Sequence, residues 1–580
     1  MNSGSQDEDT QSIWRRLRHH KVAEWTLAYA AAAYTLLHVV EMASGALDWP
    51  RVVMRITTLV LMLGLPVAST VAWFHGYKAQ HRVSGLELMV LSALLGLGGT
   101  AVWLWGYRST AERTVAARVD AEPPATVEMK SIAVLPFVNM SSDPEQEYFS
   151  DGISEQILDA LASVPDLRVI ARTSSFAFKG TNADVATIAA KLQVAYVLEG
   201  SVRKSGQRVR VTTQLIRATD SSHVWSETFD RQIGDIFAIQ DEIARTVVKR
   251  LELRTRDGKV RSRGTTSNTE AYALFLQSRY LLDQRGAESM QQAYDRIRHV
   301  VELDSGYADA WALLGSIQFT RADYALTDAA TAFAEARAAT QKALSIDPDN
   351  VEGLLIAAQF AGSHDWQWAQ ANDYLRRAMQ MEPGNARVLS VAGSNSLYQG
   401  HLDEAIRLYQ QSLLVDPMRP AVHRTIAVAL LAAGRPHEAE SAMHTALRLN
   451  PEQISGMYWL GRAQLATGQL DAALETMRQE KTPVYRNTGL ALVYHALGRK
   501  QESDAALQAL LHTTTQGSIG YQFAEVHAYR GELDEAFRWL DRALDANDAG
   551  IKFVKADVRM AGIRADPRYD ELLKRMNLSE

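Results

Sequence analysis

Apolar and polar positions follow three different patterns along the chain, and each pattern predicts a different kind of structure. Three long apolar runs come first, at residues 22–46, 56–74 and 86–107. Each run is long enough for a helix that crosses about 30 Å of hydrocarbon. Residues 131–253 then mix short apolar runs with strict alternation and with helical periodicity. From residue 270 onward only helical periodicity remains.

The mixed pattern of residues 131–253 predicts a small α/β domain. Strands are expected at 131–138, 167–170, 196–204, 208–218 and 223–229, and helices at 148–163, 185–192 and 236–253. In the fourth strand Val209, Val211 and Leu215 alternate with polar residues, so one face should be buried and the other solvated. The last three strands follow one another closely, which predicts an antiparallel meander.

The C-terminal part of the chain repeats with a period of 34 residues. Asp-Pro or equivalent pairs place prolines 35, 34 and 34 residues apart, at Pro348, Pro383, Pro417 and Pro451. Glycines keep the same step, and each is followed five residues later by an alanine: Gly400 and Ala405, Gly434 and Ala439, Gly468 and Ala473. Such a period predicts stacked helix pairs, with a glycine turn, a close contact at the alanine and a proline beyond the second helix.

This pattern resembles the tetratricopeptide repeat. One unit carries the family positions in full, at Ile426, Ala427, Leu430, Gly434, Ala439, Met443 and Ala446. About eight units fit within residues 270–547, although the unit that contains Trp311 has roughly nine extra residues and another has Ser503 in place of alanine. The resemblance implies an all-α superhelix whose first helices line a concave groove. Residues 548–580 are expected to cap the last repeat, and His364, Trp366 and Trp368 to serve packing and helix capping.

Four motifs between residues 131 and 253 resemble the TolB-like, or FlgO-like, amino-terminal domain. They are Ser-Ile-Ala-Val-Leu-Pro-Phe from Ser131, Tyr-Phe-Ser-Asp-Gly from Tyr148, Arg-Thr-Ser-Ser-Phe from Arg172 and Tyr-Val-Leu-Glu-Gly-Ser-Val from Tyr196. The resemblance implies a bacterial protein, and in this family the domain often precedes a repeat array and follows several membrane spans. The predicted fold is therefore multidomain: three transmembrane α-helices, a small α/β TolB-like domain and a tetratricopeptide-repeat superhelix.

The basic residues predict how such a chain would sit in a membrane. Residues 1–21 carry a basic cluster, and Lys78 and Arg82 lie between the second and third apolar runs. The positive-inside rule places both segments in the cytoplasm. Three spans within 22–107, followed by a linker at 108–130, would put the remaining domains in the periplasm. The prediction is a multi-pass protein of the bacterial inner membrane, with a second linker at 254–269.

Composition excludes several classes of chemistry. The chain has no cysteine, which removes disulfides, thiolate catalysis and cysteine metal sites. A net charge of −6 gives no support for nucleic-acid binding. No phosphate-binding loop, zinc-protease or hydrolase motif is present. We therefore expect no catalytic, cofactor-binding or metal-binding residues.

Two sets of polar residues in the α/β domain are nevertheless candidates for a site. Asp151, Glu155 and Asp159 share one helical stripe and could bind a cation or supply paired carboxylates, but a solvated helix face is favoured. Ser174 and Ser175 with Lys179 could form a nucleophile and base. The neighbouring Phe176 and Phe178 favour instead a strand edge or loop that anchors the sheet. In the first apolar run, His38 and Glu41 could form a proton relay, but the third run offers no ionisable partner.

The resulting functional prediction is a non-enzymatic, membrane-anchored scaffold. It would bind protein or peptide partners in the repeat groove, with the TolB-like domain as a second interaction surface and homo-oligomers left open. The groove candidates supply hydrogen bonds or charge: Gln318, Asn395, Arg424, Arg462 and Tyr494. The alternative is a sensory or regulatory membrane protein that passes a signal to a separate cyclase, kinase or transcription factor.

Overall fold

The structure is a computed structural model of the 580-residue chain. It describes residues 130–143, 146–164, 166–253, 266–283, 287–323, 326–513 and 519–579, together with positions 29, 31, 33–35, 37, 38 and 61. The chain divides into two compact units, Met1–Val127 and Glu128–Glu580, and the following account concerns the second unit unless stated otherwise.

The prediction of three transmembrane helices is contradicted. No helix within the described residues has both the length and the apolar character that a membrane crossing requires. The multi-pass inner-membrane location, with a cytoplasmic amino terminus and periplasmic repeats, is contradicted with it. These predictions rest on the apolar runs, the flanking basic residues and the family resemblance, none of which involves a contact within the fold. The three runs, the His38–Glu41 relay and the two linkers lie wholly or largely outside the described residues.

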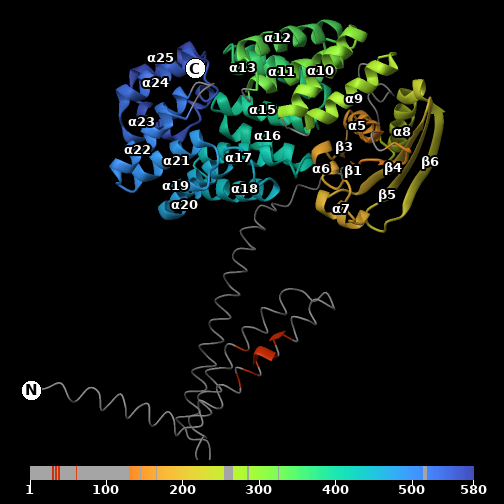
Figure 1. The fold of residues 1–580 in the computed structure, drawn as a ribbon, viewed down its shortest axis with the longest axis horizontal. Coiled ribbons are helices and arrows are strands. Elements are labelled where there is room, and N and C mark those ends of the chain that lie inside the picture. The colour runs from red at the N-terminus through yellow and green to blue at the C-terminus, as the bar shows by residue number, and fades with distance from the viewer. Residues whose placement is uncertain are drawn as a thin grey trace, which may run out of the picture. The chain divides into compact units, whose positions relative to one another are not determined.

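The α/β domain is built on one mixed sheet, shown in orange and yellow in Figure 1. The strand order is β3-β1-β4-β5-β6, and β2 pairs with β4 off this path. Strands β1, β3 and β4 run parallel, whereas β4, β5 and β6 form the predicted antiparallel meander. The strands are β1 (Lys130–Val134), β2 (Val138–Asn139), β3 (Leu167–Val169), β4 (Tyr196–Ser205), β5 (Arg208–Arg217) and β6 (His223–Gln232).

Helices cover the two faces of this sheet unequally. The face that carries Leu198, Val202 and Val211 packs against α5 (Glu147–Ala162) and α8 (Ile236–Arg250). The opposite face packs against α7 (Val185–Leu192) only near β1 and β4, through Ala133 and Val197. Ile216 of β5, opposite Val197, is also buried. Because side chains alternate along a strand, the remainder of that second face is mainly polar residues of β4, β5 and β6.

The predicted strands and helices of this domain are confirmed to within a few residues at most ends. Two elements were missed, namely β2 and the short helix α6 (Arg172–Phe176). Neither is long enough to show a periodic pattern. Phe178, predicted with Phe176 to lie in a strand edge or loop that anchors the sheet, lies in the turn after α6 and packs in the core that α7 forms with the sheet. Phe176 instead ends α6, and Ser174 and Ser175 are fully buried within this helix.

Sixteen helices, α9 to α24, form eight antiparallel pairs in the described part of the repeat region. Figure 1 shows them as a continuous array that runs from green to blue. They are α9 (Thr269–Asp283), α10 (Ala287–Leu303), α11 (Ala308–Asp323), α12 (Ala329–Ile346), α13 (Val351–Ser363), α14 (Trp368–Met381), α15 (Ala386–Tyr398), α16 (Leu402–Val415), α17 (Pro420–Ala432), α18 (Pro436–Leu449), α19 (Gly456–Ala466), α20 (Leu470–Arg478), α21 (Pro483–Ala496), α22 (Lys500–Leu511), α23 (Gly520–Arg530) and α24 (Leu533–Asp545).

The repeat positions have the roles that the sequence predicts. Gly434 lies in the turn between α17 and α18 with φ +73°, a left-handed conformation that favours glycine. Ala439 is fully buried where the two helices meet, together with Met443 and Ala446. Odd-numbered helices contact the next odd-numbered helix from α11 to α23. We call the surface that these first helices form the first-helix face.

The unit that departs from the alanine rule compensates with hydrogen bonds. Ser503 of α22 is buried, and its Oγ donates to the carbonyl oxygen of Ala491 at 2.5 Å. Arg530 donates to the same Oγ from the next unit. A buried hydroxyl is tolerated when its hydrogen bonds are satisfied, so serine can occupy the close-contact position in this unit.

The α/β domain docks on the repeats at two places that are distant in sequence. At the first, a Cβ on Gly152 of α5 would lie 2.6 Å from Leu276 of α9, so the two helices approach closely. At the second, the Ser174 Oγ lies 2.6 Å from Asp416 Oδ1 and accepts the backbone N–H of Met418. The backbone N–H of Ala171 also donates to the carbonyl oxygen of Val415.

The Asp416 carboxylate at this second junction predicts a pH dependence of stability. Burial raises the pKa of Asp416, despite Arg419 and the hydrogen bond from Ser174, which act in the opposite direction. The folded protein therefore holds the Asp416 proton more tightly than the unfolded chain, and Asp416 costs stability as the pH rises from its ordinary pKa through the raised one. We expect Asp416→Asn to be more favourable relative to the native protein at pH 7 than at pH 4.

Urea denaturation of both proteins at pH 4, 5, 6 and 7 measures this difference. Subtracting one pH profile from the other removes the contribution of all other titrating groups. A difference that stays constant or shrinks toward pH 7 would show that Asp416 does not titrate in this way.

Candidate functional site

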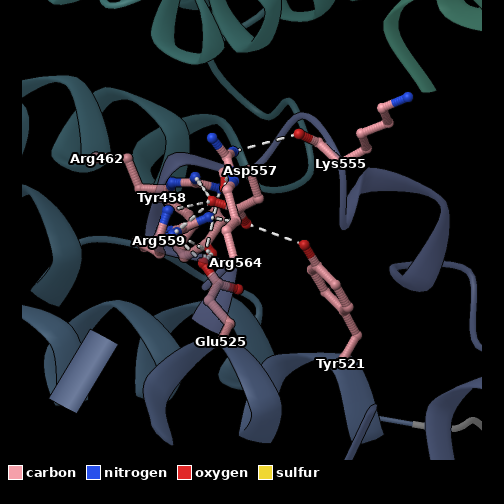
Figure 2. A network of polar contacts seen from close by, with 8 residues as sticks. All are labelled: Tyr458, Arg462, Tyr521, Glu525, Lys555, Asp557, Arg559 and Arg564. Atoms are coloured by element: carbon pink, nitrogen blue, oxygen red, sulfur yellow. Dashed lines mark hydrogen bonds and ion pairs between the residues drawn. The ribbon is translucent and has the colours of Figure 1, made fainter. Parts of the chain in front are cut away.

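A buried cluster of charged groups lies where the C-terminal segment meets the first-helix face. Arg462 of α19 places its Nη2 3.1 Å from Asp557 Oδ1 and its Nη1 3.7 Å from Glu525 Oε1. Arg559 forms ion pairs with the same two carboxylates. Tyr458 of α19 donates to Glu525 at 2.6 Å. Figure 2 shows that these side chains converge from α19, α23 and the C-terminal segment.

The charges of this cluster balance. Two guanidinium groups face two carboxylates, and all four side chains are at most 7% exposed. Tyr521 adds a hydrogen bond to Asp557 Oδ2 at 3.1 Å. Burial alone would raise the pKa of Asp557, but Arg559 and Arg462 outweigh it and hold that pKa well below its usual range. Buried charges are tolerated when they are paired and hydrogen-bonded, and these pairs join the C-terminal segment to α19 and α23.

Apolar contacts extend the attachment of the C-terminal segment. The segment contains the turns η4 (Ile551–Phe553) and η5 (Val558–Ile563) and the helix α25 (Pro567–Arg575). Its buried side chains form one cluster with α23, α24 and Trp368, a residue of the third repeat. The indole Nε1 of Trp368 donates to the carbonyl oxygen of Met576 at 2.8 Å. The segment thus caps the last repeat and also reaches back to the third.

The predicted packing and capping role of three residues agrees with these contacts. His364 packs against the rings of Phe333 and Phe360, with centroids 4.5 and 5.7 Å away. The carbonyl oxygen of Trp366 accepts a hydrogen bond from Asn577.

Three of the five groove candidates are engaged inside the protein. Arg462 belongs to the buried charge cluster. Gln318 is 3% exposed, donates to Glu335 and accepts from Arg321 at 2.8 Å. Asn395 is 8% exposed and donates to Asn372 Oδ1 at 2.6 Å. Each of these side chains has its hydrogen bonds supplied by the chain itself.

The other two candidates are half-buried. Tyr494 of α21 lies under the guanidinium of Arg499, 4.8 Å from the ring centroid. Arg424 of α17 has one long contact, 3.5 Å from its Nη1 to Ser455 Oγ. Its Nε is buried and has no hydrogen-bond partner among the described residues. Arg424 is therefore the candidate whose donors are least satisfied.

The carboxylate stripe of α5 is not the solvated face that was expected. Asp151 is 3% exposed and Glu155 is 7% exposed. The stripe pairs with basic residues: Lys179 lies 2.6 Å from Asp151, and Arg279 of α9 pairs with both Glu155 and Asp159. Burial raises the pKa of Asp151 in spite of Lys179. These carboxylates position α5 against α9 and the loop that follows α6.

Lys179 does not act as a base for Ser174. It donates to Asp151 and Glu147, whereas Ser174 contacts Asp416 on the repeats. No group of three or more potential metal ligands occurs within the described ranges.

Sequence reasoning missed Asp557, Arg559 and Glu525. Glu525 and Arg559 belong to regions that the sequence predicts to be a helix and a cap, where charged residues are usually solvated. One signal was available: Tyr458, Tyr521 and Glu525 lie on the apolar side of their helices. That pattern indicates buried polar groups that need partners.

Comparisons with known proteins match two parts of the chain to families. A family described as HilA/YgeH-like transcriptional regulator, second domain, matches residues 128–246. The tetratricopeptide repeat matches residues 390–435 and 424–484. A protein of Rhizobium meliloti (strain 1021) named "Putative adenylate cyclase 3" is 43% identical over 222 residues, and the match covers 38% of each chain. The match thus spans well under half of that relative.

Solved structures show weaker likenesses. The human IFIT1 dimer with m7Gppp-AAAA is 14% identical with a TM-score of 0.39, over 59% of this chain and 77% of that one. Pseudomonas aeruginosa pilF is 19% identical with a TM-score of 0.30, over 36% of this chain and 92% of that one. The tetratricopeptide repeats predicted in the C-terminal region are confirmed by the family match and the helix pairs, whereas the TolB-like resemblance of the α/β domain stays a prediction.

Proposed function

We propose that this chain is a non-enzymatic scaffold that binds protein or peptide partners through the first-helix face of its repeats. Stacked helix pairs present an extended surface that suits an extended or helical peptide. The α/β domain and the C-terminal segment, each fixed to the array by buried polar contacts, hold the curvature of that surface.

The observation that carries this proposal is the incomplete bonding of Arg424. A buried polar group without a partner costs about 1–3 kcal/mol, and more when it is charged. A guanidinium presents a planar fork of donors that suits a carboxylate. A partner that places an acidic side chain or a C-terminal carboxylate beside Arg424 would pair with the terminal nitrogens of its half-buried guanidinium, of which Nη1 has only the 3.5 Å contact to Ser455. Tyr494, two units further along, would add a second contact.

The α/β domain supplies a second interaction surface in this proposal. Strand β6 is the last strand in the sheet order, so one of its edges has no neighbouring strand within the described residues. An extended segment of a partner can add to such an edge through main-chain hydrogen bonds.

Substitution of Arg424 tests the proposal. Partners of the tagged chain are first crosslinked in a bacterial host, identified and purified, and their dissociation constants are then measured with the purified protein. We expect Arg424→Ala to weaken binding at least about tenfold, as for loss of a charge-assisted hydrogen bond. Arg435→Ala is the matched control, because Arg435 is exposed and pairs with Glu438 on the second helix α18. Equal losses in both variants, or none in either, would refute the role of Arg424.

A regulatory function is the second candidate. The Rhizobium relative is named as an adenylate cyclase, and the family that matches residues 128–246 is described as a transcriptional regulator. Both descriptions favour a chain that passes a signal to a separate cyclase or transcription factor. Identification of either kind of protein in the crosslinking experiment, with binding lost in Arg424→Ala, would favour regulation over passive scaffolding.

A further inference from the structure

A cavity of about 620 Å³ lies beside the segment that follows β1 and over the middle of β4 and β5. From β1 the chain continues to β2, which pairs with β4. Open α/β sheets commonly bind ligands beyond the carboxyl ends of their parallel strands, and β1 ends at this cavity. Its volume is within the range of about 300–1,000 Å³ that is usual for small-molecule sites.

One wall of the cavity is apolar. Leu135, Phe178 and Ile188 line it and belong to the small core that α7 forms with the sheet. Phe137 also lines the cavity, but its ring belongs to the core on the α5–α8 face of the sheet. A Cβ on Gly200 would lie 3.1 Å from that ring and 2.3 Å from the carbonyl oxygen of Thr212. Glycine at position 200 is thus required for the ring of Phe137 and the backbone of β5 to come this close to β4.

The floor of the cavity is polar. Glu199 follows Val197 by two positions, so both side chains lie on the same face of β4. Glu199 lines the cavity together with Ser201. Gln214 of β5 lies directly opposite Glu199 in the ladder. The Glu199 carboxylate is half-buried and forms no hydrogen bond or ion pair with any other described residue.

The basic residue at the cavity does not neutralise the negative charge of Glu199. The basic residue that lines the cavity is Lys179, and its ammonium is held by Glu147 at 2.8 Å and by Asp151 at 2.6 Å. These three groups alone carry a net charge of −1, and Glu199 adds another negative charge. A cavity with an apolar wall and a negative floor favours a ligand that joins an apolar group to a positive charge.

We infer that this cavity is a binding site for a small organic cation, with the apolar part of the ligand against Phe178 and Ile188 and its ammonium or guanidinium donating to Glu199. The site lies in the α/β domain, away from the first-helix face, and does not depend on partner binding there. It would make the domain responsive to a small molecule.

Three probes of similar shape and different charge test this inference on the purified full chain. They are tryptamine, the neutral alcohol tryptophol and the anion indole-3-acetate, with affinities measured by isothermal titration calorimetry. We expect tryptamine to bind at least about tenfold more tightly than indole-3-acetate, with tryptophol in between. Failure of the native protein to bind tryptamine, or tighter binding of the anion, would overturn the inference.

Variants locate the site. Glu199→Gln keeps the shape of the side chain and should reduce tryptamine affinity about tenfold while leaving tryptophol binding unchanged. Unchanged tryptophol binding also shows that the variant is folded. Ala183→Trp, at a residue that lines the cavity, should abolish binding of both probes.

Glu227→Gln is the control, because Glu227 is exposed on the opposite face of the same sheet. Equal tryptamine affinity of the native protein and Glu199→Gln would overturn the inference, as would an equal loss in Glu227→Gln.

Discussion

Asp557→Ala is expected to lower the free energy of unfolding by about 3–5 kcal/mol, the usual cost of removing one partner from a buried ion pair. The substitution would leave Arg462 and Arg559, each at most 7% exposed, with Glu525 as their shared carboxylate. It would also remove the acceptor of the Tyr521 hydroxyl. The loss should appear as a lower midpoint in urea denaturation followed by circular dichroism.

Asp541→Ala is the matched control for this measurement. Asp541 also pairs with an arginine, at 2.6 Å from Arg575, but its side chain is 59% exposed. Exposed ion pairs contribute about 0–1 kcal/mol, so the control should change the midpoint little. Similar losses in the two variants would mean that the buried cluster stabilises the protein no more than a surface pair does.

Ala439→Trp is expected to cost about 3 kcal/mol, at the upper end of the range for overpacked cores. Ala439 is fully buried where α17 and α18 approach, and the neighbouring core residues Met443 and Ala446 are also fully buried. An indole cannot fit there unless the helix pair separates. Because the repeats transmit curvature from unit to unit, the substitution should also weaken partner binding on the adjacent first helices.

Ser441→Trp in the same helix is the control for Ala439→Trp. Ser441 is exposed, so an indole at this position meets solvent and should change stability by less than about 0.5 kcal/mol. Thermal unfolding of both variants separates the two positions. An equal shift would indicate that the register of the repeat is wrong by at least one residue.

The sequence predicts well those parts of the fold that depend on residues close to one another in the chain. The turn at Gly434 and the contact at Ala439 recur every 34 residues, so several units report the same constraint. The alternation in β5 likewise follows from one buried face. The helix α6, with five residues, is too short to show either kind of period.

The buried charge cluster and the contacts between the α/β domain and the repeats depend on residues that are far apart in the chain. Arg462 and Asp557 are 95 residues apart, and Ser174 and Asp416 are 242 residues apart. Nothing in the neighbourhood of either residue in sequence indicates its partner. Side-chain chemistry alone therefore identifies groove candidates from the sequence. Three of the five candidates, Gln318, Asn395 and Arg462, form hydrogen bonds or ion pairs with other parts of the chain. The membrane prediction is wrong for a related reason, because hydropathy, flanking basic residues and a family resemblance supported it without any contact within the fold.

The hydrogen bond between Trp368 and Met576 has a consequence for folding during translation. Repeat arrays usually fold unit by unit, because each repeat contacts only its neighbours. Here two residues that are 208 positions apart must meet before the array is complete, and such distant contacts form slowly. During translation the side chain of Trp368 and its apolar neighbours in the third repeat stay uncovered until Met576, just after α25, has left the ribosome. In that interval the nascent chain presents apolar surface on which a chaperone can act.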